Sequence, residues 1–284
     1  MSLSRDIQNR FSGLYVPEKL IIINFLVFIL NSLAVFLFKL PPDYFMRWFE
    51  LPRHLPDFFG QPWSLITYSF FHGNFMHLFW NMVLLFVSGR LFLNLFPARR
   101  FITLYFLGAA FGGFIFLLSY NLFPAFLGLR TALVGASAAI MCILIFVCTY
   151  TPNQDIRLIF INIKLWHVGA FFVILDLVQI PVGNSGGHLA HLGGAFTGFF
   201  YARTLRKGTG ESWLTSFMQG FGKKRSPLKT VYKNKRKNSP SPPVSNRKNE
   251  EQHKIDTILD KISKSGYESL SKAEKDFLFK AGKE

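Results

Sequence analysis

A serine and a histidine lie inside apolar segments, where neither side chain is expected without a partner. Ser137 stands in the sequence Gly135-Ala136-Ser137-Ala138 near the start of one apolar run, and His191 lies near the start of another. Polar residues at such depth are costly unless they are paired or face water, so they are functional candidates. An imidazole that takes the proton of a serine hydroxyl activates it as a nucleophile. The pair therefore predicts a protease that works inside a membrane.

Other polar residues have the spacing that such a reaction needs. His77 and Asn81 are four residues apart and share a helix face, whereas His72 is expected to point well away from that face and to order the helix start. Together with the backbone N–H of Ser137, the side chains of His77 and Asn81 are placed to stabilise the oxyanion formed by attack on a peptide carbonyl. Gly135 is expected to let the chain enter the helix without steric conflict.

Glycines follow His191 on its own helix face. Gly194 and Gly198 fall on that face, and small residues there let another helix backbone approach closely. If the partner is the helix that carries Ser137, the two residues form a serine–histidine dyad.

Two further polar residues are predicted to have no part in the chemistry. Nothing in the spacing of Asp176 ties it to His191, so no acidic third member is apparent and Asp176 is expected to bond to a loop or a lipid headgroup. His188 is expected to face the loop at the membrane interface, although a role as a second ligand or proton relay remains open.

The elements that must position these residues are apolar helices. Half of the residues are hydrophobic and 17% are aromatic, more than in an ordinary soluble domain. They predict an all-α membrane protein, a bundle of six transmembrane helices, from six runs: Leu20–Phe38, Phe75–Phe92, Ile102–Tyr120, Ala132–Tyr150, Leu165–Ile180 and Leu189–Thr204. The fifth run is the shortest, and it is the weakest of the six predictions of a membrane helix.

Basic residues predict the orientation. Arg5, Arg10 and Lys19 precede the first run, no A-x-A-like site follows it, and the tail beyond Thr204 holds more than half of the basic residues. We therefore expect both termini in the cytoplasm of a bacterium, the bundle in its inner (cell) membrane, and the active site open to the extracytoplasmic side. With this orientation the second, fourth and sixth helices all run inward, so the polar residues near their starts share one depth.

Composition divides the chain into four parts. We expect a cytoplasmic arm over 1–17, the six-helix core over 18–205, a basic disordered linker over 206–250 and a small helical hairpin over 251–284. The basic tail is expected to be attracted to anionic lipid headgroups. Nucleic acid is the rival partner, but no recognised binding motif supports it.

These residues together resemble a known family. His72-x4-His77-x3-Asn81, Gly135-x-Ser137 and Ala190-His191-x2-Gly194-x3-Gly198 are similar to the motifs of the rhomboid intramembrane serine proteases. The resemblance covers roughly residues 18–205. It implies Ser137 as nucleophile, His191 as base and acid, His77 with Asn81 as the oxyanion site, and transmembrane proteins as substrates. It also implies that the fifth helix and the loop 181–187 form a gate.

Four positions depart from the family's pattern. Ala138 replaces a glycine that commonly follows the serine, Met141 stands where a tyrosine often stacks on the histidine, Ser64 replaces an arginine, and Leu93 replaces a glutamate. None of these changes removes a group that does chemistry. They bear on rate and substrate preference.

Two alternatives belong to other classes of protein. Four histidines at one depth would suit a zinc site, but no carboxylate cluster or His-Glu-x-x-His motif accompanies them, so we expect neither metal nor cofactor. A catalytically silent rhomboid-like protein that binds and routes membrane clients is the other alternative, and the presence of both Ser137 and His191 argues against it.

Overall fold

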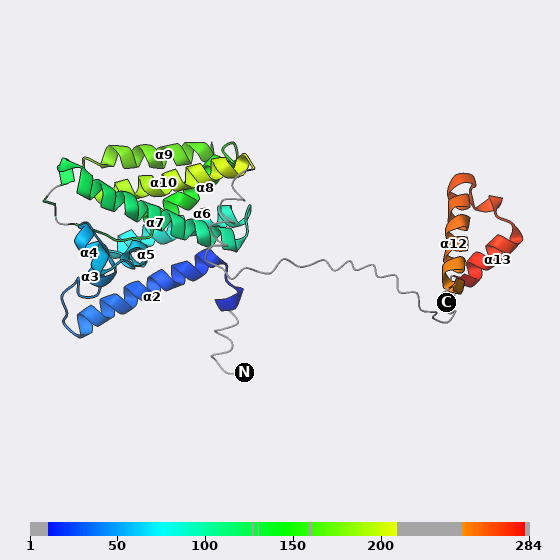
Figure 1. The fold of residues 1–284 in the computed structure, drawn as a ribbon, viewed down its shortest axis with the longest axis horizontal. Helices are drawn as coiled ribbons and strands as arrows, with labels where there is room; N and C mark the ends of the chain where they lie inside the picture. Colours follow the sequence, from blue (N-terminus) through cyan, green and yellow to red (C-terminus); the bar gives the residue numbers. More distant parts are fainter. Residues whose placement is uncertain (1–10, 127, 130, 159–160, 209–245, 282–284) are drawn as a thin grey trace, which may run out of the picture. The chain divides into compact units, whose positions relative to one another are not determined.

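The computed structural model describes residues 11–126, 128–129, 131–158, 161–208 and 246–281. The chain divides into two compact units, Met1–Lys224 and Arg225–Glu284. Helices make up most of both units (Figure 1).

The first unit contains long apolar helices. Three helices in the described part of the chain are long and apolar enough to cross a membrane: α2 (Val16–Leu37), α6 (Phe75–Leu93) and α7 (Ala98–Leu122). Two apolar helices are shorter, α8 (Ser137–Tyr150) and α9 (Leu165–Gln179), and α10 (Ser185–Arg206) is long but opens with polar and glycine residues. The prediction of a mostly helical membrane protein is therefore confirmed.

Two small sheets correct the all-α prediction. The strand β2 (Ala132–Leu133) pairs antiparallel with β1 (Leu51–Pro52), so the predicted run Ala132–Tyr150 is not one helix and α8 begins only at Ser137. The second sheet pairs β3 (Asp155–Leu158) antiparallel with β4 (Ile161–Lys164). Strands this short carry almost no periodicity in the sequence, and β1 finds its partner far along the chain.

Short helical turns complete the first unit. They are α3 (Met46–Phe49), α4 (Leu55–Gly60), α5 (Ser64–Thr67), η1 (Tyr68–Phe70) and η2 (Pro124–Phe126). The helix α10 starts earlier than predicted, so the predicted gate loop 181–187 is shorter, and Ser185, Gly186 and Gly187 belong to the first turn of that helix.

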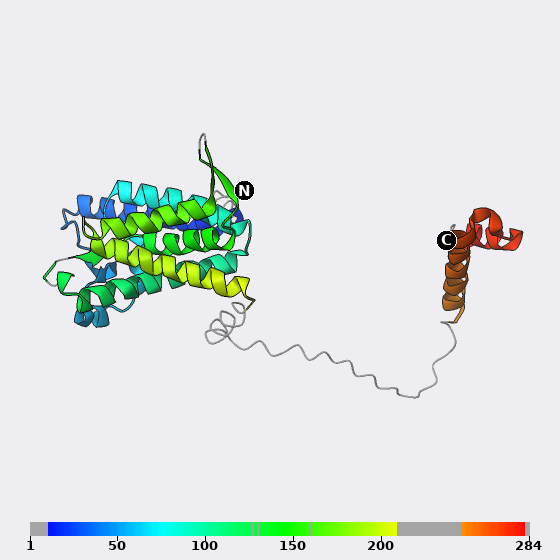
Figure 2. The same ribbon diagram turned by 90° about the horizontal axis from the view of Figure 1, so that it is seen from above.

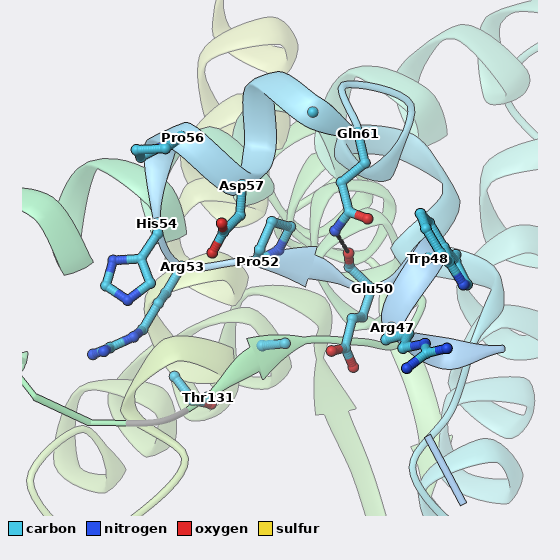
Figure 3. Close-up of a pocket in the computed structure, with 12 residues that line it drawn as sticks. Arg47, Trp48, Glu50, Pro52, Arg53, His54, Pro56, Asp57, Gln61 and Thr131 are labelled. Atoms are coloured by element: carbon cyan, nitrogen blue, oxygen red, sulfur yellow. Dashed lines mark hydrogen bonds between the residues drawn. The ribbon is translucent and has the colours of Figure 1, made fainter. Parts of the chain in front are cut away.

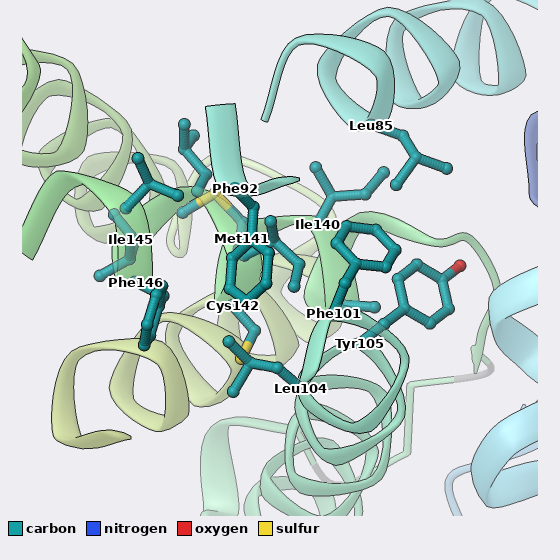
Figure 4. Close-up of a cluster of buried hydrophobic side chains, with 14 of the residues drawn as sticks. Leu85, Phe92, Phe101, Leu104, Tyr105, Ile140, Met141, Cys142, Ile145 and Phe146 are labelled. Carbon is teal, nitrogen blue, oxygen red and sulfur yellow. The ribbon is translucent and has the colours of Figure 1, made fainter. Parts of the chain in front are cut away.

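The helix α8 forms the centre of the first unit. Every residue from Ala138 through Cys148 is buried, because α6, α7, α9 and α10 all pack on it. Figure 1 shows α8 and α10 between α9 at one edge and α2 at the other, and Figure 2 shows the same helices from above. Phe92, Phe101 and Phe146 join Ile140 and Cys142 in the core around α8 (Figure 4). Ser137 is therefore the first residue of a helix that the rest of the unit encloses.

The second unit is a helical hairpin. It consists of α12 (Asn246–Ser265), η3 (Tyr267–Ser269) and α13 (Lys272–Ala281). Gly266 follows α12 with φ of 77°, and its N–H donates to the carbonyl of Ile262 at 2.9 Å. A capping box precedes α13, since the N–H of Ser271 donates to Glu274 at 2.7 Å and the N–H of Glu274 donates to Ser271 Oγ at 3.4 Å. Most of the predicted linker, and most of the predicted arm, lie outside the described residues.

Candidate active site

The predicted site residues meet in one cavity. Its volume is about 370 Å³, and four helices contribute to its wall: α6 with His77 and Asn81, α8 with Ser137, α9 with Asp176, and α10 with His191. Residues that are far apart in the sequence therefore face one space, as the shared depth of the helix starts predicted. The cavity is lined by apolar groups as well, which keeps its polar groups in a partly dry environment.

A backbone hydrogen bond holds the turn before Ser137. Gly135 has φ of 114°, a conformation that favours glycine, and its N–H donates to the carbonyl of Tyr68 at 2.9 Å. The N-cap of α8 is Ala136, and no side chain caps the helix there. The first N–H groups of a helix have no partner within it, so this end of α8 offers donors to the cavity.

His72 supports this turn directly. Its Nε2 accepts the N–H of Ala136 at 3.4 Å, and its ring packs edge-on against His77 with centroids 5.1 Å apart. The prediction that His72 points well away from His77 is therefore wrong. Helical spacing does not apply, because His72 precedes the first residue of α6 and the chain bends between them.

His77 and Asn81 lie beside the turn. Asn74 caps α6 by accepting the N–H of His77 at 2.8 Å, and the side-chain amide of Asn81 donates to the carbonyl of His77 at 2.8 Å. A Cβ placed on Gly135 would lie 2.6 Å from His77 Nε2 and 3.7 Å from Ser137 Oγ. The imidazole and the hydroxyl thus flank the space that only a glycine leaves open.

Two glycines fix the distance between α10 and α8. A Cβ on Gly194 would overlap the carbonyl oxygen of Ala138, and one on Gly198 would overlap that of Cys142. The backbones therefore touch on the face of α10 that carries His191. Within the described chain, Ser137 and His191 meet as walls of one cavity and are not joined by a direct hydrogen bond. Catalytic hydrogen bonds are often long before substrate binds.

The contacts of Asp176 differ from those predicted for it. Its Oδ1 lies 2.8 Å from Nδ1 of His191 and 2.7 Å from Nδ1 of His188, and the residue is only 5% exposed. Its side-chain partners among the described residues are these two imidazoles, so the prediction of a bond to a loop or a headgroup is wrong. The spacing along the sequence gave no sign of this contact, because the two helices come together only through tertiary packing. His188 likewise points to the carboxylate from the first turn of α10 and not to the loop.

The same three side chains are the ones able to hold a metal ion in the described part of the chain. Their ligand atoms lie within 4.8 Å of one another. Both imidazoles already direct Nδ1 at the carboxylate, so their arrangement is that of a hydrogen-bonded cluster. The four histidines considered for zinc separate into two pairs, His72 with His77 and His188 with His191.

A second hollow is lined by residues of α3, β1, α4 and β2. Its volume is about 820 Å³, and Arg47, Arg53, His54 and Asp57 are among its lining residues (Figure 3). It is larger than the cavity at Ser137, but neither a serine nor a cysteine lines it. Size alone therefore does not identify the site, and the chemistry of the lining residues favours the smaller cavity.

Comparisons with known proteins agree with the family that the sequence motifs indicate. The Rhomboid domain model matches residues 59–208, more than half of the chain, and a family of unknown function (DUF6576) matches residues 244–281. The chain is 29% identical over 141 residues to Presenilin-associated rhomboid-like protein A, mitochondrial, of Danio rerio, covering 48% of this chain and 36% of that protein. RHOMBOID-like protein 12, mitochondrial, of Arabidopsis thaliana is 30% identical over 162 residues, with 52% and 48% covered.

A third relative is Presenilin-associated rhomboid-like protein, mitochondrial, of Bos taurus, 28% identical over 183 residues, with 63% of this chain and 44% of that protein covered. The match spans less than half the length of each of these three curated relatives. All three are named as mitochondrial, which contradicts the predicted location in a bacterial inner (cell) membrane. Hydropathy and loop charge report insertion and orientation, and they do not distinguish one host membrane from another.

Proposed function

The chain belongs to the rhomboid family, and from this premise we propose that it is an intramembrane serine endopeptidase with a Ser137–His191 dyad. The observation that carries the proposal is the single cavity in which Ser137, His191, His77 and Asn81 meet. In it a nucleophile, a base and oxyanion donors surround one space of a size that admits a peptide group.

The proposed reaction has two halves. Nε2 of His191 takes the hydroxyl proton as Ser137 Oγ bonds to the substrate's carbonyl carbon, and the carbonyl π electrons move to the oxygen. When the tetrahedral intermediate collapses, the C–N bond breaks and the proton passes from Nε2 to the leaving amine. Water then attacks the acyl-enzyme in the same manner, His191 accepts its proton, and the acid product leaves as the proton returns to Ser137.

We propose three donors for the oxyanion. The backbone N–H of Ser137, the imidazole of His77 and the free hydrogen of the Asn81 amide are assigned to it. Removing one such donor elsewhere costs about 2.7–4 kcal/mol of transition-state stabilisation. Asn81 is buried and hydrogen-bonded to the carbonyl of His77, so its amide is pre-oriented.

The substrates we propose are transmembrane segments of other proteins. A membrane helix hides its peptide bonds in intrahelical hydrogen bonds, so cleavage needs a locally unstable helix and a cavity that admits water. The helix α9 and the turn that follows it line the cavity through Phe172, Leu175 and Asn184, and they are the candidate gate.

The bundle we propose crosses the membrane six times, with the shorter helices α8 and α9 and the helix α10 joining the three long ones. The short α8 is supported in this role because it is enclosed by protein and need not match the lipid thickness alone. The names of the relatives favour a mitochondrial membrane.

The test is cleavage of a model transmembrane substrate by the purified full chain in proteoliposomes. Ser137→Ala and His191→Ala are expected to abolish cleavage, and a fluorophosphonate is expected to label Ser137 in the wild type alone. Ser88→Ala is the matched control, because Ser88 is a buried membrane-helix serine that bonds only to its own helix, at the carbonyl of Leu84. Cleavage that survives Ser137→Ala would refute the dyad. A wild type that neither labels nor cleaves would favour a protein that binds clients.

A further inference from the structure

We propose that Asp176 is the positioning residue for His191. The carboxylate orients the imidazole, and the imidazole acts on Ser137. This inference rests on the proposed function and extends it. The carboxylate lies 2.8 Å from His191 Nδ1, and the side chains are 7% and 20% exposed. A contact this short between largely buried groups is a hydrogen bond that water does not replace.

The contact selects the reactive tautomer of His191. An ionised carboxylate has no hydrogen to give, so Nδ1 must donate and Nε2 is left with its lone pair. Nε2 is the atom that the proposed reaction needs as base. As Nε2 takes the serine proton, the imidazolium that forms remains bonded to the carboxylate, which stabilises the charge and keeps no proton itself.

His188 fixes the carboxylate from a second side. Its Nδ1 lies 2.7 Å from the same oxygen, Oδ1, and its ring is nearly perpendicular to that of His191, with centroids 5.7 Å apart. The other oxygen, Oδ2, is buried and has no hydrogen-bond partner among the described residues. Asp176 therefore directs its hydrogen bonding through Oδ1 to two histidines on one helix, which is the arrangement of an orienting group and not of an anchor to lipid.

No other described residue that lines the cavity has a carboxylate that could orient His191. Asp176 from α9, His188 from α10, His77 from α6 and Ser137 from α8 share the cavity with His191, together with the uncharged side chains of Asn81 and Asn184. Among the described lining residues Asp176 is the sole acid, and neither lysine nor arginine lines the cavity. The backbone contact of Gly194 with α8 holds α10 in place, so the carboxylate is needed to set the ring orientation and not the helix position.

The test compares Asp176→Asn, Asp176→Glu and His188→Gln in the full chain, with kcat and KM measured separately on the model transmembrane substrate. The amide nitrogen of asparagine donates to Nδ1 and favours the opposite tautomer. We expect Asp176→Asn to lower kcat on the order of 10²-fold or more, by analogy with aspartate removal in serine proteases, while KM changes little. Fluorophosphonate labelling of Ser137 should slow in parallel. Asp176→Glu should recover part of the rate, and His188→Gln should lose less than Asp176→Asn.

A structural control separates the orientation of the ring from a general loosening of α10. Thr197 Oγ1 donates to the carbonyl of Gly193 at 3.0 Å on the same helix as His191, and Thr197 does not line the cavity. Thr197→Val is expected to keep the wild-type kcat. An equal loss in Thr197→Val, or a wild-type kcat in Asp176→Asn, would overturn the role of Asp176.

The failure of this inference is distinct from failure of the proposed function. Cleavage by Ser137→Ala would overturn the serine mechanism itself. An inactive Ser137→Ala beside a fully active Asp176→Asn would leave the dyad intact and remove only Asp176 from it.

Discussion

Replacing Gly194 by alanine is predicted to separate the two reacting side chains. The new Cβ would overlap the carbonyl oxygen of Ala138 and lie 2.9 Å from its carbon. Ordinary contact between carbon atoms is about 3.5–4.0 Å, so α10 must move away from α8 by roughly 1 Å. Gly194 lies three residues after His191 on the same face, so the imidazole moves with it.

Both activity and stability should respond to this movement. A misplacement of about 1 Å costs about 10²-fold in rate, so we expect that loss in kcat for cleavage of the model transmembrane substrate. Overpacking destabilises by about 1–3 kcal/mol, and alanine in a helix recovers about 1 kcal/mol relative to glycine, so the net loss of stability is small. Gly194→Ala should therefore remain folded while it loses activity.

The assay pairs fluorophosphonate labelling of Ser137 with thermal unfolding in detergent. Gly89→Ala is the matched control, because its Cβ would lie 2.5 Å from the ring of Pro17 and would overpack α6 against α2, away from the cavity. It is expected to cause a similarly small loss of stability without slowing the labelling. A Gly194→Ala variant that labels at the wild-type rate would refute the argument that the glycine contact sets the dyad distance.

Two further predictions concern the turn before the nucleophile and the second unit. Gly135→Ala should lower cleavage at least tenfold, because φ of 114° costs a residue with a Cβ about 1–3 kcal/mol and that Cβ would lie 2.6 Å from His77 Nε2; wild-type cleavage would contradict this. In α13, a hydrogen bond from the N–H of Ser271, helped by Lys261, lowers the pKa of Glu274 from 4.5 to about 2. The capping box should therefore stabilise α13 fully above pH 4.5 and lose that effect as the pH falls toward 2. Carbon-13 NMR of the Glu274 carboxyl should titrate near pH 2, Lys261→Met should raise the midpoint, and a wild-type midpoint near 4.5 would contradict the prediction.

The candidate site residues and the positions of most of the long helices could be predicted from the sequence alone. Apolar runs of helical length predicted the positions of α6 and α9 to within a residue or two, because hydrophobic periodicity is a local property. Because the second, fourth and sixth helices were expected to run in the same direction across the membrane, the sequence also predicted that Ser137, His77 and His191 share one depth. The motif spacing was enough to indicate the rhomboid family.

Only the tertiary structure decided how these groups touch. The hydrogen bond between His191 and Asp176, the support of Ala136 by His72 and the pairing of β1 with β2 all join segments whose approach is set by helix packing. Sequence spacing describes one helix at a time, and a contact between helices depends on where glycines let the backbones meet. The contact of Gly194 with the backbone of α8 brings α10 close enough for Ser137 and His191 to line one cavity. This approach could not be read from their shared depth alone.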